Sequence, residues 1–453
     1  MTKQQQQQHH QKQKVDRRLA LFDIDEIEKG RHLGAGGFNE VYEISNFTPH
    51  SRSAKLKRPH NEARRALQEH VRSETTGETR FAIKYLKNQW ADQEAFETAA
   101  LDLATEAELM SSIDHPNILK LRGLATHGLD SFATMERIDG FFIILDRLDQ
   151  TLAEKVTQWQ KQIKSGASNN MKMRMEQLKC ALEVASALEY LHGEGIIYRD
   201  LKPENIGIDA RDVTKIFDFG LARELPEEAV MDDLFEMSGK IGTARYMSPE
   251  VYLREPYNEK ADVYSFAHVL WEILATEKPY EGFTKQMHKE RVIRKGNRPA
   301  IDPTWPFAVH YLLKRAWDDD IDKRPNMTEI RVILETEYRA IQHICGSAAM
   351  GEVRQRRRAS VFDWTASRSH STLSTASISE SERDDDIVSD NEDGTKRDKP
   401  HHSIDRETMT NEPRTRVQRR SAFQNVLNHF EEKGSESFEE SLRGMTRVPA
   451  VTA

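Results

Sequence analysis

The chain has 453 residues, of which 37% are hydrophobic and 31% charged, so it is long enough for two or three folded units but too polar to be folded throughout. Its 66 basic and 74 acidic residues give a formal net charge of −8, which offers no global case for nucleic-acid binding. Two cysteines argue against a disulfide framework, and no apolar run approaches the ~20 residues that cross a bilayer. We expect a cytoplasmic protein, with a nuclear location as the alternative, that binds neither nucleic acid nor membrane.

Composition predicts three regions along the chain. Residues 1–19 are polar and rich in Gln and His, which is typical of disorder. Residues 20–345 alternate apolar runs with turn signals, as a packed domain does. Residues 346–453 are dominated by Ser, Thr and charged residues and cannot bury enough apolar surface to offset their ordering entropy. Within this tail only residues 416–445 carry enough large apolar side chains to predict a short helix.

The first motif is a glycine-rich turn early in the packed region. Its glycines would let backbone amides approach phosphate oxygens closely, and its last residue would cover a nucleotide base. Alone, the pattern also fits an ordinary hairpin. The nine residues are Leu33, Gly34, Ala35, Gly36, Gly37, Phe38, Asn39, Glu40 and Val41.

An insert at residues 46–78 separates two strand-like runs, Glu40–Ile44 and Arg80–Tyr85. It is basic, so a docking or phosphate-binding surface is one interpretation. The favoured interpretation is a solvated helix and loop added to a hairpin. The basic residues are Arg52, Lys55, Lys57, Arg58, Arg64, Arg65 and Arg72.

The second motif is a strand, Phe81-Ala82-Ile83-Lys84, that ends in lysine. A lysine after apolar residues is usually a surface residue whose stem lies along the protein, so its meaning depends on a carboxylate partner. The following residues, Ala95 to Ile113, predict a helix that carries Glu106 and Glu108.

The third motif carries the strongest chemistry. Asp200, Lys202 and Asn205 stand within six residues, and Asp218-Phe219-Gly220 begins thirteen residues after Asn205. Asp200 would accept or orient a hydroxyl proton, and Lys202 would neutralise a transferring phosphoryl group. Asn205 and Asp218 would hold Mg²⁺, which prefers oxygen ligands. Both patterns in this order, after a glycine-rich turn and a strand lysine, are hard to explain by chance.

These motifs resemble those of the eukaryotic protein kinases over roughly residues 28–340. Residues Gly242 to Glu250 look like the end of an activation segment, and Asp262 to Ala267 look like the start of the helix that anchors the catalytic loop. Lys323-Arg324-Pro325 resembles the late motif whose arginine, Arg324, pairs with Glu250.

The resemblance implies a bilobal α+β fold. A small lobe, residues 20–147, would contain an antiparallel sheet and one key helix, and a mainly helical lobe would span residues 148–345. ATP would lie between them, with Lys84 fixed by Glu106, which the family's spacing selects. The adenine would lie beside Ala82 and bond backbone groups of Asp146 and Leu148, with Leu145 guarding the back pocket.

The resemblance also indicates the kinase class. Lys202-Pro203-Glu204 and Thr243 are typical of serine/threonine kinases, and the run from Asp262 to Leu274 is most similar to the tyrosine-kinase-like group. Several positions depart from the family pattern, among them Ser248, where Ala is usual, and Phe217, where a small residue is usual. Tyr198 replaces a more common His, and Asn39, a residue that tolerates left-handed backbone, replaces the third glycine of the loop. Gly207 replaces a large floor residue, and we suggest that Phe217 fills the vacated space, although each side chain could equally point elsewhere.

Two rival functions remain open: a pseudokinase scaffold and a small-molecule kinase. A pseudokinase scaffold would be expected to lose a catalytic residue, and none is lost. A small-molecule kinase is disfavoured by residues 242–250, which shape a peptide-docking surface in protein kinases.

We expect protein substrates and an upstream kinase, with Ser238 as an activation-segment acceptor. In the tail, Ser360 follows a run of arginines, so another kinase or the chain itself could modify it; a merely solvated or nuclear-targeting run is the third interpretation.

Overall fold

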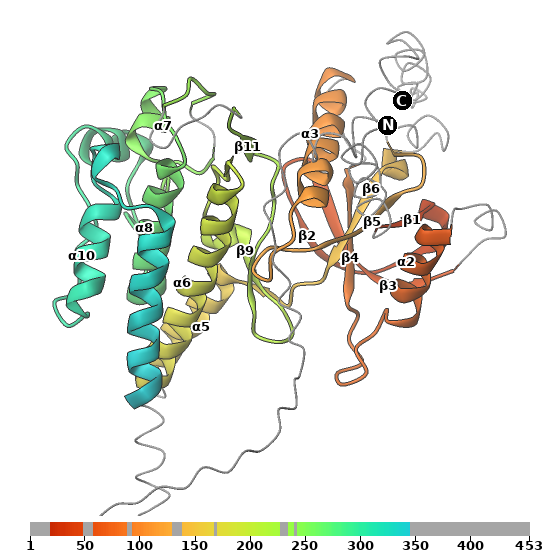
Figure 1. The fold of residues 1–453 in the computed structure, drawn as a ribbon, viewed down its shortest axis with the longest axis horizontal. Coiled ribbons are helices and arrows are strands. Elements are labelled where there is room, and N and C mark those ends of the chain that lie inside the picture. The colour runs from red at the N-terminus through yellow and green to blue at the C-terminus, as the bar shows by residue number, and fades with distance from the viewer. Residues whose placement is uncertain are drawn as a thin grey trace, which may run out of the picture. The chain divides into compact units, whose positions relative to one another are not determined.

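The protein is described by a computed structural model that covers residues 19–48, 58–87, 93–128, 138–166, 170–226, 234–239 and 242–344 (Figure 1). The described residues up to His343 belong to one compact unit. The predicted polar segment before residue 19, the predicted tail with its helix at 416–445, and Ser360 lie outside the described residues.

The small lobe is built on a six-stranded sheet with the order β1-β5-β6-β4-β3-β2. All neighbouring strands are antiparallel except β1 and β5, which are parallel. The predicted antiparallel sheet is therefore confirmed, with one parallel strand added at its edge. The strands are β1 (Ala20–Phe22), β2 (Ile27–Ala35), β3 (Asn39–Phe47), β4 (Phe81–Leu86), β5 (Leu121–Ala125) and β6 (Phe142–Asp146).

The key helix of this lobe is α3 (Gln93–Ser112), which packs against β4 and β5. It matches the helix predicted over residues 95–113. Every residue of β4 is buried, which explains why this central strand is a continuous apolar run broken only by Lys84. The strand and the helix together bring a lysine and a glutamate into the same interior.

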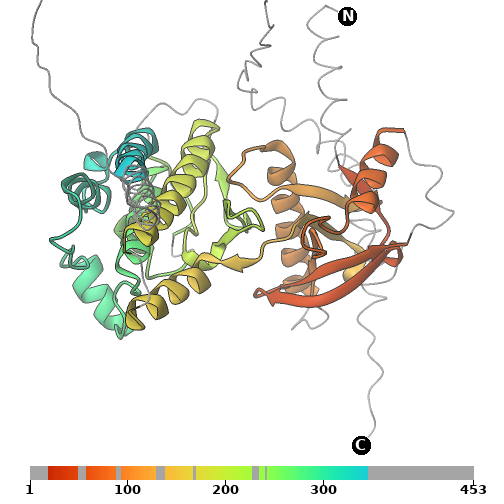
Figure 2. The same cartoon turned by 90° about the horizontal axis from the view of Figure 1, so that it is seen from below.

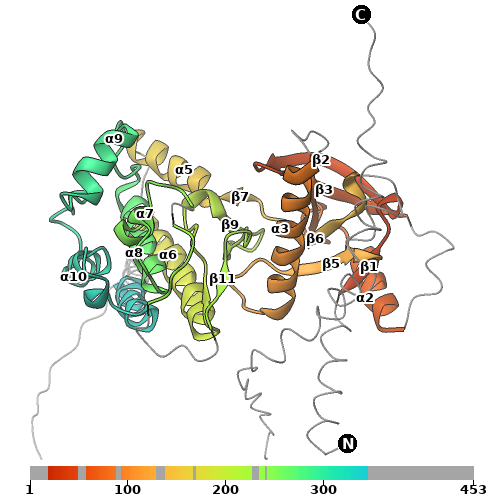
Figure 3. The same ribbon diagram turned by 90° about the horizontal axis from the view of Figure 1, so that it is seen from above.

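The insert between β3 and β4 contains α2 (Arg58–Glu69), which packs beside β1 (Figures 1 and 3). Arg64 is only 4% exposed. Its guanidinium makes two contacts of 2.8 and 3.0 Å with the Glu26 carboxylate and lies 4.3 Å from the centre of the Phe22 ring. The predicted solvated helix is thus corrected, because residues 20–26 supply a surface that buries one face of α2.

The large lobe is mainly helical, as predicted, and its helices follow the small sheet in the chain (Figures 1 and 2). Its central helix, α8, is buried from Lys260 to Leu274 and packs against α6 and α10. None of the helices in the described part of the chain is long and apolar enough to cross a membrane. The helices are α5 (Leu152–Lys164), α6 (Asn170–Gly193), α7 (Pro249–Leu253), α8 (Lys260–Ala275), α9 (Lys285–Met287), α10 (Phe307–Ala316) and a helix over residues 327–344.

Short strands of the large lobe lie beside the connection from the small lobe. They are β7 (Gln150–Thr151), β9 (Ile206–Ile208) and β10 (Thr214–Ile216), which form one sheet, and β8 (Ile196–Ile197) and β11 (Arg223–Glu224), which form another. The Leu119 amide donates to the Ile216 carbonyl at 2.9 Å, and Asn117 Nδ2 donates to the Thr214 carbonyl at 3.0 Å. These bonds tie the segment after α3 to β10, the strand that immediately precedes the Asp-Phe-Gly motif.

Candidate active site

Lys84 on β4 lies between two carboxylates from distant parts of the chain. Its Nζ atom is 2.8 and 2.7 Å from the two carboxylate oxygens of Glu106 on α3 and 3.1 Å from Asp218 Oδ1. Lys84 and Glu106 are buried, whereas the side chain of Asp218 is 46% exposed. The structure therefore pairs Lys84 with the glutamate that the family spacing selects and joins that pair to the Asp-Phe-Gly motif.

The charges in this cluster shift one another's pKa. Burial alone would lower the pKa of Lys84, but the carboxylates of Glu106 and Asp218 outweigh burial and raise that pKa above its ordinary value. The Lys84 charge is the main cause that lowers the pKa of Asp218. Burial raises the pKa of Glu106 against the opposing effect of Lys84. At neutral pH the site thus presents a charged ammonium beside an ionised, accessible aspartate.

The loop that carries Asp200 is held at its backbone by α8. The two carboxylate oxygens of Asp262, in the first turn of α8, accept bonds of 2.8 Å from the amides of Tyr198 and Arg199. Arg199 has a φ of 69°, a conformation that a residue with a side chain rarely adopts. The sequence assigned Asp262 only to the start of an anchoring helix, and the structure shows that its carboxylate makes the anchoring contact.

The Asp200 carboxylate accepts hydrogen bonds from three residues. Lys202 Nζ and Asn205 Nδ2 lie 2.6 and 2.9 Å from Oδ2. The amide and the hydroxyl of Thr243 lie 3.0 and 3.2 Å from Oδ1. Asp200 is 8% exposed, so these donors fix the orientation of a nearly buried carboxylate. The structure thereby brings the catalytic-loop residues together with the end of the activation segment.

The two predicted magnesium ligands supply oxygen atoms. The Nδ2 group of Asn205 donates to the Asp200 carbonyl at 3.0 Å and to the Asp200 carboxylate, which leaves the amide oxygen as the atom suited to a cation. The Asp218 carboxylate is accessible and has a lowered pKa. No group of three or more His, Cys, Asp or Glu in the described ranges forms a metal site. Because Mg²⁺ is usually held by one or two protein carboxylates with phosphates and waters, these oxygens fit it.

The glycine-rich turn joins β2 to β3. Among the described residues, a Cβ on Gly34 or Gly37 would meet nothing within 4 Å, and one on Gly36 would meet only the Asn39 carbonyl oxygen, at 4.0 Å. None of the three glycines has a positive φ. Neither crowding nor backbone conformation therefore requires glycine here, which supports a role in admitting a ligand close to the backbone.

Asn39 does not use the left-handed conformation that the sequence suggested for it. It is the first residue of β3 and pairs with Leu86 on β4. Its carbonyl accepts a 2.8 Å bond from the Gly36 amide, which closes the turn. Its Oδ1 atom is buried and has no hydrogen-bond partner among the described residues. The turn therefore forms without a third glycine, because Asn39 belongs to the stem of the hairpin.

The remaining residues of the predicted phosphate loop lie along that stem. Ala35 pairs with Glu40, and Val41 pairs with Lys84. Val41 and Leu33 are half-buried, whereas Phe38 at the tip is 54% exposed.

The predicted hinge follows β6. Leu145 is buried and pairs with the buried Ala82 on β4, and Arg122 holds the Asp146 carboxylate with bonds of 2.7 and 2.8 Å. Among the described residues, the Leu148 amide and carbonyl make no backbone hydrogen bond. The Leu148 groups are thus open to a ligand, whereas the amide of Asp146, the other predicted hinge residue, already donates to the Lys120 carbonyl at 3.1 Å.

The floor beneath the hinge differs from our suggestion. A Cβ on Gly207 would lie 2.3 Å from Leu148 Cδ1, so Leu148, and not Phe217, occupies the space above Gly207. The backbone of Phe217 is held in place, because its amide donates to the Asn205 carbonyl at 3.0 Å and its carbonyl accepts the Tyr198 hydroxyl. Sequence spacing could not show that a hinge residue would reach across to β9.

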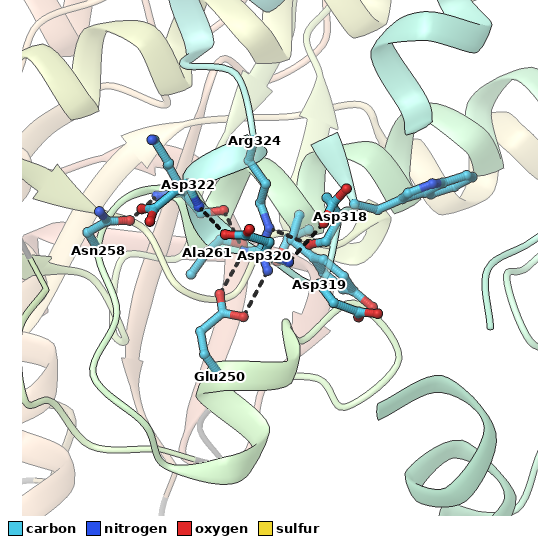
Figure 4. Close-up of polar contacts among 12 residues, drawn as sticks. Glu250, Asn258, Ala261, Asp318, Asp319, Asp320, Asp322 and Arg324 are labelled. Atoms are coloured by element: carbon cyan, nitrogen blue, oxygen red, sulfur yellow. Dashed lines mark hydrogen bonds and ion pairs between the residues drawn. The ribbon is translucent and has the colours of Figure 1, made fainter. Parts of the chain in front are cut away.

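The late-motif arginine pairs with the activation segment as predicted. Arg324 donates to the two carboxylate oxygens of Glu250 at 2.7 and 2.9 Å, and Figure 4 shows this pair surrounded by acidic residues of the 318–322 loop. Earlier in the segment, the Ser238 hydroxyl lies 3.2 Å from Arg199 Nη1, which is also 3.2 Å from the Tyr257 hydroxyl. Ser238 therefore lies beside the arginine that precedes the catalytic aspartate.

One buried acid near the site was missed by sequence reasoning. Glu272 on α8 accepts a 2.7 Å bond from the Tyr246 hydroxyl and is 1% exposed. Burial raises its pKa to about 7. The only signal in the sequence was a charged residue within an apolar helix, and that signal does not identify Tyr246 as the partner of Glu272.

Comparison with known proteins agrees with this geometry. A family model described as protein tyrosine and serine/threonine kinase matches residues 27–334. The serine/threonine-protein kinase STY17 of Arabidopsis thaliana is 40% identical over 164 residues, which are 36% of this chain and 28% of that protein. A probable serine/threonine-protein kinase of Dictyostelium discoideum is 32% identical over 255 residues, 56% of this chain and 25% of that protein.

A third relative carries a broader description. The serine/threonine/tyrosine-protein kinase HT1 of Arabidopsis thaliana is 35% identical over 158 residues, 35% of this chain and 39% of that protein. The matches thus span between a quarter and two fifths of these relatives, while the family model covers well over half of this chain. From its sequence, its fold and its site, the chain belongs to the protein tyrosine and serine/threonine kinase family.

Proposed function

We propose that this chain transfers the γ-phosphoryl group of ATP to serine or threonine hydroxyls of protein substrates. The observation that carries the proposal is the bonding of Lys84 to both Glu106 and Asp218. These bonds join the small lobe to the Asp-Phe-Gly motif and leave the Asp218 carboxylate accessible. In this geometry the Lys84 ammonium would stabilise the negative charge of the nucleotide phosphates. The glycine-rich turn would cover them with its backbone amides.

Asp200 would act on the attacking hydroxyl. As the substrate oxygen forms a bond to the γ-phosphorus, its proton would pass to the Asp200 carboxylate, and the bond between that phosphorus and the oxygen of ADP would break. The ammonium of Lys202, 2.6 Å from Asp200, would neutralise charge on the transferred group. Magnesium, held by Asn205 and Asp218, would supply further positive charge at the phosphates. Catalysis would thus rest on positioning and electrostatics.

Two contacts favour serine and threonine over tyrosine as acceptors. Lys202 and Thr243 both bond the Asp200 carboxylate, which is the arrangement that the resemblance associates with serine/threonine kinases. HT1 is nevertheless described as a serine/threonine/tyrosine kinase, so the acceptor residue has to be measured. The rival interpretation is a scaffold that binds nucleotide without efficient transfer.

The test is phosphate transfer from radiolabelled MgATP to a generic protein substrate by the purified full-length chain. We expect labelled phosphoserine and phosphothreonine in the wild type. Asp218→Asn should abolish labelling, because the amide removes a carboxylate charge at the cation while it keeps the shape of the side chain. Equal labelling by wild type and Asp218→Asn after matched purification would reject the catalytic assignment. Nucleotide binding without labelling in the wild type would favour the scaffold.

A further inference from the structure

Lys87, just beyond the end of β4, makes an unexpected set of contacts with the glycine-rich turn. Its Nζ atom is 2.6 Å from the Gly36 carbonyl oxygen and 3.3 Å from the Gly37 carbonyl oxygen. Its own backbone amide donates to the Phe38 carbonyl at 2.9 Å. One residue therefore bonds three successive carbonyl groups at the tip of the turn.

These bonds fix the direction of the amides in the same peptide groups. In a trans peptide the carbonyl and the next N–H point in opposite directions. The Gly36 and Gly37 carbonyls face Lys87, so the N–H groups of Gly37 and Phe38 face away from it.

The opposite side is the side of the cleft. Successive side chains on a strand point to opposite faces of the sheet, and Lys84 points to Glu106 and Asp218. The pairing of β3 with β4 continues one residue past the end of β4, because the Lys87 amide bonds the Phe38 carbonyl next to the Asn39–Leu86 pair. Alternation along the extended strand therefore places Lys87, three residues after Lys84, on the opposite face of the sheet. Because Lys87 holds the Gly36 and Gly37 carbonyls on its own side of the sheet, the N–H groups of Gly37 and Phe38 point toward the side on which Lys84 lies.

We propose that Lys87 is a positioning residue for the nucleotide: it holds the tip of the glycine-rich turn so that the Gly37 and Phe38 amides face the nucleotide's phosphates. The inference rests on the proposed function, because it assumes that ATP occupies the cleft. Asn39, which stands in place of a third glycine, is fixed in the stem of the hairpin, so the tip at residues 36–38 is the part that Lys87 orients. In this role Lys87 acts through the backbone carbonyls of the turn that it bonds.

The test compares ligands with and without phosphate groups. Equilibrium affinities for MgADP and for adenosine are measured on the full-length wild type and on Lys87→Met, Lys87→Arg and Lys120→Met. Lys120 is a matched control, because its side chain is 43% exposed, pairs with Asp114 and carries the same charge. We expect Lys87→Met to weaken MgADP binding about threefold to tenfold, the scale of a lost charged hydrogen bond near solvent, and to leave adenosine binding unchanged.

The controls separate positioning from charge and from folding. Lys87→Arg should restore most of the MgADP affinity, because a guanidinium can donate to both carbonyls, and Lys120→Met should match the wild type. The inference is overturned if Lys87→Met binds MgADP as the wild type does, if it weakens adenosine equally, or if Lys120→Met shows the same loss. A wild type that binds neither ligand would reject the proposed function itself, which distinguishes that failure from a failure of Lys87.

Discussion

Two buried ion pairs in this molecule have similar lengths and different surroundings. Lys84 and Glu106 meet at 2.7 Å, and Arg324 and Glu250 also meet at 2.7 Å. The Arg324 side chain is completely buried and donates to two backbone carbonyls, those of residues 318 and 260, in addition to the carboxylate. Its donors are thus largely satisfied within the large lobe.

The pair at Lys84 is open on one side. The ammonium is shared with Asp218, whose side chain is 46% exposed, so a ligand in the cleft could compete for its charge. The comparison teaches that burial and short distance do not by themselves separate a stabilising ion pair from a functional one. The two pairs differ in their exposure to a ligand. The donors of Arg324 are used inside the fold, whereas the Lys84 pair adjoins an exposed carboxylate that a substrate can reach.

The largest effect is expected from Arg324→Met. The substitution leaves the Glu250 carboxylate buried without its partner, so the free energy of unfolding should fall by about 3–5 kcal/mol. Denaturant titration of the wild type and the variant measures this change. The double variant Glu250→Gln with Arg324→Met should lose less than the sum of the single changes, and a loss below about 1 kcal/mol in Arg324→Met would contradict the assignment.

Lys84→Met should instead act on the rate. We expect phosphate transfer to fall about 10²–10³-fold, the usual cost of one catalytic electrostatic contact. Stability should fall less than in Arg324→Met, because burial already raises the pKa of Glu106 and the freed carboxyl can accept a proton. Rates and unfolding curves from the same preparation test both statements. A rate within about threefold of the wild type would be far smaller than the expected loss. Such a result would remove Lys84 from the catalytic set.

A third buried carboxylate extends the comparison, because the bond from Tyr246 to Glu272 comes from a neutral hydroxyl. The pKa of Glu272 is raised from 4.5 to about 7, so its stabilising contribution is complete below about pH 4.5 and is lost as the pH rises through 7. Glu272→Gln keeps an acceptor for Tyr246 and avoids burying a charge. We expect it to be more stable than the wild type at pH 8.5 by about 1–3 kcal/mol, with no difference near pH 4.5. A difference that does not change with pH would refute this explanation.

The smallest effect is expected at Ser238. A phosphate on this hydroxyl would meet Arg199, which already lies 3.2 Å away, and would order the segment by charge pairing. Ser238→Ala should therefore lower the transfer rate severalfold in protein that has been activated with ATP. Mass spectrometry of the same samples shows which sites are filled. Undiminished activity in a variant phosphorylated elsewhere on this segment would count against Ser238.

The sequence predicted the parts of the molecule that depend on short patterns. The helix expected over residues 95–113 is α3, and the turn, strand lysine and catalytic loop lie where their motifs indicated. In each case the chemistry restricts the residue type at a fixed spacing, so a local pattern carries the information. The contacts of Lys84 with Glu106 and Asp218 then follow from the fold.

Contacts between segments far apart in the chain could not be predicted in this way. Arg64 is one of seven basic residues in the insert, and nothing local marks it as the one that meets Glu26. The same holds for the contact of Leu148 with Gly207, since a missing Cβ does not show which neighbour fills its place. The parallel strand β1 was also missed, because a three-residue edge strand has too short a pattern to recognise.

The contact between β1 and α2 has a practical consequence for where the folded domain starts. The family match begins at residue 27, yet Glu26, the partner of the buried Arg64, and the whole of β1 precede it. A chain trimmed to the family boundary would keep the guanidinium while losing its carboxylate, and it would uncover the backbone donors and acceptors of β5 that β1 now engages. Such an uncovered edge is a template for pairing with another chain. A shortened protein should therefore begin before Ala20 if it is to stay free of aggregates.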